Sequence, residues 1–257
     1  MTTSRTMCDE LPPAEPKFDR NLVAYVTAML DGSPLDPAVR AKVASSEAVA
    51  TREQEAAERR LSDWPELSRY RAANAQAAEL DLVMIGDSIT EIWGLATPNL
   101  FGTRVINRGV GGQTSAQILL RFMADVIDLQ PRRVHILCGT NDIAGNTGPS
   151  LPVDYQRNIR AMVTLAQAND IGVLLASIPP AATIPWSTEA LPLTFIPRLN
   201  AWLRDLADAK GLTFVDYHAI LDDGAGGLRE EYSADGVHVT RAAYRAMHAE
   251  LMRVMND

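Results

Sequence analysis

The stretch LVMIGDS, residues 82–88, decides the fold that we predict for this chain. Its four apolar residues have the length of a buried strand, and Gly86-Asp87-Ser88 ends the run and opens a helical segment. The same order of apolar run, polar or glycine-rich loop and helical segment recurs along the rest of the chain. The further apolar runs lie at residues 105–106, 134–137, 173–176 and 214–215.

Helical patterns separate these runs. They lie at residues 114–129, 154–169, 199–209 and 240–255. Strands that alternate with helices favour a parallel sheet covered on both faces. The sequence therefore predicts an α/β protein: a three-layer α/β/α sandwich around a five-stranded parallel sheet of the flavodoxin-like kind.

The chain before residue 79 follows a different pattern. We interpret residues 1–78 as an N-terminal tail and helical extension, and residues 79–257 as the main domain. Residues 1–18 are polar and proline-containing, and further helices are expected at 36–60 and 64–78. Leu22, Val26 and Met29 form an apolar stripe on a first helix that stops at Asp31-Gly-Ser-Pro34. Such a stripe needs a cover, from its own chain or from a second subunit, and we favour a homo-oligomer contact.

Composition excludes several classes of function. The chain has 257 residues and a net charge of −8, which argues against nucleic-acid binding. No run of 18 apolar residues is present, so no membrane span is expected. The N-terminus lacks the apolar core of a secretory signal, so we expect a cytoplasmic protein. The two cysteines, Cys8 and Cys138, predict neither a disulfide framework nor a zinc site.

In a sheet of this kind, we expect the functional site to lie beyond the carboxyl ends of the strands. Ser88 stands there, where a serine either caps the helix or acts as a nucleophile. A nucleophile needs a base, and His238 is the strongest candidate because Asp235, three residues earlier, could hold its imidazole. A turn before a helix is the structural alternative. The other histidines are His135 in an apolar run, His218 after the fifth run as a modest candidate, and His248 in the last helix.

Ester hydrolysis also requires hydrogen-bond donors for a developing oxyanion. Three are available at strand ends: the backbone N–H of Ser88, the backbone of Gly112 in a glycine-rich loop, and the side-chain amide of Asn141. Each has a structural alternative, since Gly112 could serve only a turn and Asn141 only a loop cap. Together they supply nucleophile, base and donors from four loops of one sheet edge.

With these residues assembled, the chain resembles the SGNH, or GDSL-type, hydrolase family. Four blocks match in order: Gly86-Asp87-Ser88-Ile89, Asn107-Arg-Gly-Val-Gly-Gly112, Gly139-Thr140-Asn141-Asp142 and Asp235-Gly-Val-His238. Ile89 stands where the family usually has leucine. The resemblance covers about residues 80–255 and is nearest to small bacterial esterases and the platelet-activating-factor acetylhydrolase-like branch.

This resemblance implies a serine esterase that acts on a small-molecule ester without a cofactor or metal. It assigns Ser88, Asp235 and His238 to a catalytic triad, and Ser88, Gly112 and Asn141 to the oxyanion hole. Short acyl groups, acetyl above all, are the implied substrates. A lysophospholipase, thioesterase or carbohydrate deacetylase would use the same triad, and a noncatalytic binding protein on this fold is the alternative outside enzymes.

Two tryptophans are candidates for the substrate pocket. Trp186 lies in a proline-rich stretch, residues 178–197, which we interpret as a loop on the same sheet edge as the site. It could wall the pocket or plug the core. Trp93 follows Ser88 in the chain and has the stronger claim to be a core residue.

Overall fold

The structure, a computed structural model, describes residues 20–34, 36–43 and 45–256. The predicted polar lead-in at residues 1–18, with Cys8, lies outside this range. None of the helices within it is long and apolar enough to span a membrane.

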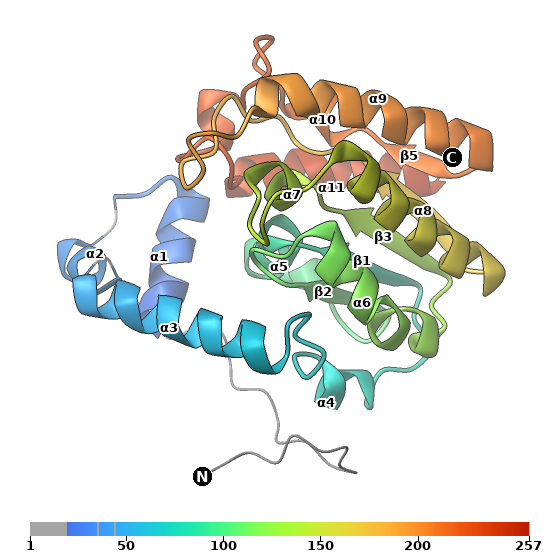
Figure 1. The fold of residues 1–257 in the computed structure, drawn as a ribbon, viewed down its shortest axis with the longest axis horizontal. Helices are drawn as coiled ribbons and strands as arrows, with labels where there is room; N and C mark the ends of the chain where they lie inside the picture. Colours follow the sequence, from blue (N-terminus) through green and yellow to red (C-terminus); the bar gives the residue numbers. More distant parts are fainter. Residues whose placement is uncertain (1–19, 35, 44, 257) are drawn as a thin grey trace.

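A five-stranded parallel sheet forms the centre of the molecule (Figure 1). Its strand order is β2-β1-β3-β4-β5, which confirms the predicted flavodoxin-like sandwich. β1 and β3 are central neighbours, so the loops that follow them meet where the strand order reverses. The strands are β1 (Leu82–Gly86), β2 (Val105–Gly109), β3 (Arg133–Leu137), β4 (Gly172–Ala176) and β5 (Thr213–Val215).

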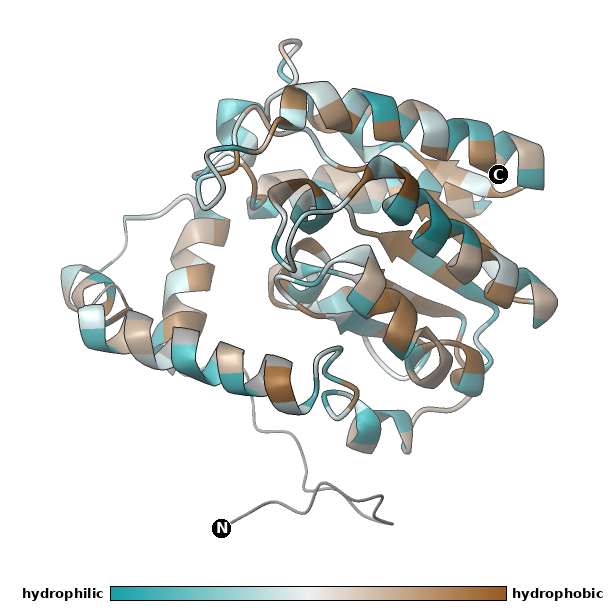
Figure 2. Ribbon diagram, in the orientation of Figure 1, coloured by the Kyte–Doolittle hydropathy of each residue, from teal (hydrophilic) through white to brown (hydrophobic). Residues whose placement is uncertain are grey.

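Helices cover both faces of this sheet because its strands are apolar on both sides. Val83 and Ile85 of β1 enter one core and Leu82 and Met84 enter the other. Figure 2 shows hydrophobic colour along the central strands and mixed colours on the helices. The first core holds α6 (Ser115–Asp125), α8 (Pro152–Ala168) and α9 (Pro192–Lys210); the second holds α1 (Arg20–Asp31), α5 (Ser88–Ala96), α10 (Tyr217–Leu221) and α11 (Arg241–Asn256).

The helix predicted for residues 36–60 is two helices, α2 (Pro37–Val43) and α3 (Ser46–Ser62). Ser45 explains the break, because its hydroxyl donates to the carbonyl of Lys42 and accepts from the N–H of Ala48. A serine that caps one helix in this way ends the preceding one.

The prediction of one helix over residues 64–78 is also wrong. Turns occupy most of this segment, and only α4 (Arg71–Asn74) is helical. The carboxylate of Asp63 accepts the N–H groups of Leu67 and Ser68, at 2.8 Å each, and these bonds fold the chain into a turn.

A third difference is α9, which begins at Pro192 and so shortens the predicted loop 178–197. Proline fits the first turn of a helix, where no N–H partner is needed.

The chain's own helices cover part of the apolar stripe of α1. Val26 and Leu30 are buried in the core that α5 and α11 share, a burial worth about 1.5–3 kcal/mol for each side chain. An ion pair of 2.6 Å joins Asp31 to Arg241, whose guanidinium also donates to the carbonyl groups of residues 95 and 96. Leu22 and Met29 of the stripe are only partly buried, and the predicted homo-oligomer contact stays a prediction.

Trp93 is a core residue and not a pocket residue. It is fully buried and packs edge-on against His135 and Tyr217 beneath α5. The indole points inward because α5 presents this side to the sheet. Burial lowers the pKa of His135 to about 3, so this histidine is neutral and structural.

Candidate active site

Ser88 begins α5 directly after β1. Asp87 caps the helix by accepting the N–H of Ile89 at 3.0 Å. Gly86 is required before it, since a Cβ there would collide with the carbonyl oxygen of Leu137 on β3. The strand-to-helix turn thus holds the half-buried Ser88 hydroxyl at the carboxyl edge of the sheet.

His238 approaches this hydroxyl from a turn 150 residues later in the chain. Its Nε2 atom lies 3.1 Å from Ser88 Oγ, and its Nδ1 atom lies 2.8 Å from Asp235 Oδ2. The turn is rigid, because Asp235 Oδ1 also accepts the backbone N–H groups of Val237 and His238, at 2.9 and 2.7 Å. Ser233 bonds to the carbonyl of His238 at 2.7 Å. The structure therefore brings together all three residues that the sequence pattern nominated.

Asp235 is held as a carboxylate. Partial burial alone would raise the pKa of its carboxyl group, but the hydrogen bond and charge of His238 and two backbone N–H groups outweigh burial and lower this pKa to about 2. An ionised Asp235 favours the neutral tautomer of His238 that carries its proton on Nδ1, and in that tautomer Nε2 is the acceptor toward Ser88. The imidazole is thereby prepared to take a proton from the serine hydroxyl.

The candidate oxyanion donors line one cavity with this hydroxyl. Gly112 adopts a φ of 81°, a conformation that glycine reaches without strain, and lines the cavity with Ser88 and Asn141. One N–H of the buried Asn141 amide donates to the carbonyl of Gln113 at 3.0 Å, which fixes the amide while leaving its second N–H. Among the described residues, none accepts a hydrogen bond from the backbone N–H of Ser88 or Gly112. These donors are suited to an oxygen that substrate would bring.

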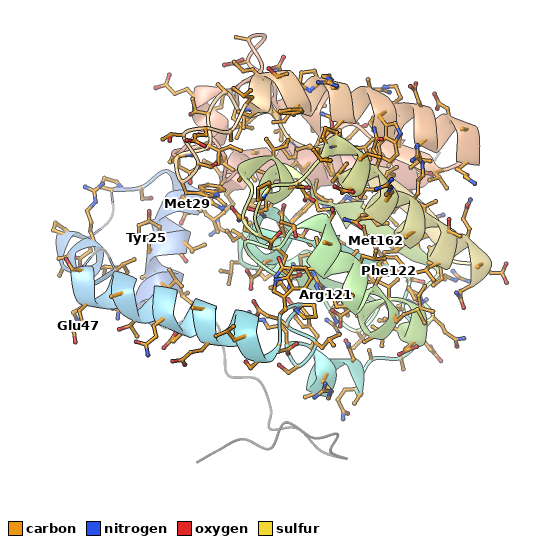
Figure 3. The ribbon with its side chains drawn as sticks, in the orientation of Figure 1. Tyr25, Met29, Glu47, Arg121, Phe122 and Met162 are labelled. Atoms are coloured by element: carbon orange, nitrogen blue, oxygen red, sulfur yellow. The ribbon has the colours of Figure 1, made fainter. Side chains whose placement is uncertain are left out.

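A buried arginine fastens the loop that carries Gly112. Arg121, labelled on α6 in Figure 3, is completely buried. It donates to the carbonyls of Gly86 and Arg108, at 2.9 and 2.7 Å, and to Gln113 Oε1 at 2.6 Å. Its counter-ion is Asp125, at 2.9 Å. Breaking such a pair would leave a charge uncompensated in the interior, so Arg121 fixes the ends of β1 and β2 relative to each other.

Residues 64–70 support this loop from outside the sheet. The side chains of Gln113 and Gln117 donate to the carbonyls of Pro65 and Trp64, at 2.8 and 2.7 Å. Arg69 pairs with Glu91 at 2.8 Å, and the carboxylate of Glu91 accepts the N–H of Gly111. The turn segment is therefore tied to both sides of the glycine-rich loop.

Two buried carboxyl groups lie behind the site. Burial raises the pKa of Asp142 to about 6 and that of Asp87 to about 7. The carboxylate of Asp142 accepts two hydrogen bonds from Ser115: one from the backbone N–H at 2.9 Å and one from the side-chain hydroxyl at 2.5 Å. This contact joins α6 to α7 (Thr140–Ala144), the short helix that carries Asn141.

The sequence pattern missed Asn146. Its amide donates to Asn141 Oδ1 at 2.8 Å and to the carbonyl of Gly112 at 3.1 Å, so it bridges two oxyanion residues. Its own oxygen accepts the indole N–H of Trp186 at 3.0 Å. A polar side chain in the loop after the third strand is the only signal that could have indicated it.

Trp186 lies over the site. Its ring stacks on His238 at a centroid distance of 5.8 Å and an interplanar angle of 29°. Of the two tryptophans considered as pocket residues, Trp186 alone lines the cavity above Ser88, which measures about 460 Å³. His218 does not line this cavity, and in the described part of the chain no cluster of three histidine, cysteine or acidic side chains could hold a metal.

Fold and site together define a serine ester hydrolase. Residues 84–246 match the model of the GDSL-like lipase/acylhydrolase family, and the chain belongs to this family. Esterase TesA of Pseudomonas aeruginosa is 30% identical over 182 residues, which span 65% of this chain and 84% of the esterase. Among solved structures, a GDSL-like lipase from Bacteroides thetaiotaomicron is 38% identical with a TM-score of 0.72, covering 76% of this chain and 98% of its own. An acetylxylan esterase from Geobacillus stearothermophilus, at 20% identity and a TM-score of 0.56, shares the fold; the match spans 70% of this chain and 96% of that one.

Replacement of Trp186 separates its two contacts. Trp186→Phe keeps an aromatic ring over His238 but loses the N–H bond to Asn146, whereas Trp186→Ala loses both. We expect kcat to fall about threefold to tenfold in the phenylalanine variant, the worth of one neutral hydrogen bond, and further in the alanine variant. Steady-state kinetics on one ester measures both. Equal kcat in the phenylalanine variant and the parent would contradict a role for the Asn146 bond.

Proposed function

We propose that this protein hydrolyses carboxylic esters through an acyl-enzyme formed on Ser88. The observation that carries this proposal is the continuous contact from Ser88 Oγ through the His238 imidazole to Asp235. Donors for an oxyanion line the same cavity. The arrangement supplies a nucleophile, its base and a site for developing charge within one cavity.

In the first half-reaction, Ser88 Oγ attacks the ester carbonyl carbon while His238 Nε2 takes the hydroxyl proton. The negative charge that forms on the carbonyl oxygen is stabilised by the N–H groups of Ser88 and Gly112 and by the Asn141 amide. His238 then gives its proton to the alcohol oxygen as the carbon–oxygen bond breaks. Asp235 stabilises the imidazolium throughout without taking the proton.

In the second half-reaction, water replaces the alcohol. His238 removes a proton from water as it attacks the acyl carbon, and the same donors hold the second oxyanion. When the tetrahedral intermediate collapses, the proton passes from His238 to Ser88 Oγ and the carboxylic acid leaves. Short acyl groups, acetyl above all, remain our expected acyl substrates, on the family resemblance.

A serine-directed fluorophosphonate tests the proposal together with a substrate panel. The panel contains p-nitrophenyl esters, acetylated sugars, an acyl thioester and a lysophospholipid. We expect p-nitrophenyl acetate to be turned over, and one phosphonate group to attach to Ser88 with a proportional loss of activity. Mass spectrometry of the peptides locates the label.

Ser233 is the matched control in the same experiment. It also lies near His238 but bonds to a backbone carbonyl and lacks a free base, so it should stay unlabelled. Labelling elsewhere, or a protein that turns over no member of the panel, would contradict the proposal and favour a binding protein on this fold.

A further inference from the structure

The N-terminal helix α1 forms one wall of the cavity above Ser88. Four of its side chains line this cavity together with the residues of the proposed mechanism: Leu22, Tyr25, Val26 and Met29. Their spacing of three, four and seven residues places them on one face of the helix. Three are aliphatic or thioether side chains, and Tyr25 adds an aromatic ring. Tyr25 and Met29 are labelled on α1 in Figure 3.

This wall has a fixed position. Val26 and Leu30 anchor the helix in the core beside Ile92 and Trp93 of α5. The ion pair from Asp31 to Arg241 fixes the end of α1 against α11. Both contacts are to the main domain, and they hold the helix face that carries residues 22, 25 and 29 beside the cavity.

The remainder of the cavity divides into a polar floor and an apolar side. Ser88, His238 and Asn141 supply the floor, where the ester group would react. Ile92 of α5 and Trp186 extend the apolar surface that begins on α1. Glu91 also lines the cavity, but Arg69 neutralises its charge.

We propose that α1 binds the hydrocarbon chain of the ester that the catalytic residues cleave. This inference rests on the proposed function and names its substrate class: esters with an apolar chain, which belongs to the alcohol if the acyl group is the short one expected above and to the acyl group otherwise. Burial of hydrocarbon against such a wall is worth up to about fourfold in kcat/KM for each methylene. The match to the family model begins at residue 84, so α1 lies outside the residues that this model matches.

Glutamine variants on α1 test the inference. Leu22→Gln and Met29→Gln keep side-chain length and helix propensity but remove apolar contact. Ala24→Gln is the matched control, because residue 24 is exposed and does not line the cavity. Tyr25→Ser is a further variant that puts the fold at little risk, since Tyr25 is 39% exposed.

Two substrate series distinguish a hydrocarbon chain in the acyl group from one in the alcohol. One varies the acyl group from p-nitrophenyl acetate to octanoate, and the other varies the alcohol from ethyl to octyl acetate. We expect the long-to-short ratio of kcat/KM to fall about tenfold in one series for the wall variants, the worth of roughly two buried methylenes. The Ala24→Gln ratio should equal that of the parent. Unchanged ratios in both series for Leu22→Gln, Met29→Gln and Tyr25→Ser would overturn the inference.

A binding measurement separates this outcome from failure of the proposed function. Calorimetry with octyl acetate on the Ser88→Ala protein reports chain binding without turnover. Weaker binding when Met29→Gln or Tyr25→Ser is added would support the wall even if the parent hydrolysed no ester. Equal affinity for octyl acetate with and without these changes would exclude α1 as the binding site of the hydrocarbon chain, whatever the catalytic result.

Discussion

Ser88→Ala is expected to lower kcat for ester hydrolysis by roughly 10³- to 10⁶-fold, the range that loss of a serine nucleophile produces in related triads. The change removes one oxygen that is bonded to His238 and to no buried partner. Because Asp87 still caps α5 and Ile89 keeps its N–H bond, the fold should be unchanged. Steady-state kinetics on p-nitrophenyl acetate gives the loss, and thermal unfolding gives the stability.

Ser233→Ala provides a comparison for this loss. It removes a hydroxyl from the same turn as His238, where the group bonds to the backbone and to Asp235 Oδ1 and does not line the cavity. We expect a much smaller fall in kcat than for Ser88→Ala. If Ser88→Ala kept activity within tenfold of the parent, the assignment of the nucleophile would be wrong.

Asp235→Asn is expected to lower kcat by ~10⁴-fold while leaving the turn folded. An asparagine can still accept the backbone N–H groups of Val237 and His238 through its oxygen. Its amide nitrogen would then face His238 Nδ1 as a donor, so the imidazole would carry its proton on Nε2 and could not accept one from Ser88. The expected loss is therefore in kcat, with KM little changed.

The pH dependence of activity provides a second test of the role of Asp235. Since the pKa of its carboxyl is lowered to about 2, Asp235 stays ionised at every pH above about 3. The parent's activity should therefore show no step from this group between pH 4 and 9. Activity of Asp235→Asn close to that of the parent at pH 8 would show that the carboxylate does not orient the base.

The strands and the three central side chains could be predicted from sequence because local patterns carry them. A buried strand in a parallel sheet is a short apolar run, as at residues 82–85, and the polar groups that follow such runs meet at one sheet edge. Ser88 stands in such a loop. His238 lies further from its strand, in a turn after α10 and before α11, and the local Asp235-Gly-Val-His238 pattern is what made it recognisable as the partner of Ser88.

The packing of the N-terminal helices could be predicted less well than the strands, because contacts with distant parts of the sequence determine it. The stripe Leu22, Val26 and Met29 indicated a covered helix but not what covers it. The cover of Val26 comes from α5 and α11, the latter more than two hundred residues further along the chain. Trp186 and Asn146 are similar, since their bond joins two irregular loops that have no periodic pattern.

The bonds between residues 64–70 and the glycine-rich loop bear on what counts as a minimal enzyme. All four sequence blocks of the family lie after residue 85, so a fragment beginning at residue 79 would contain every group that reacts. It would lack the carbonyl oxygens of Trp64 and Pro65 and the guanidinium of Arg69, which hold Gln117, Gln113 and Glu91. The supports of the active site thus extend further toward the N-terminus than the sequence blocks that contain its reacting groups.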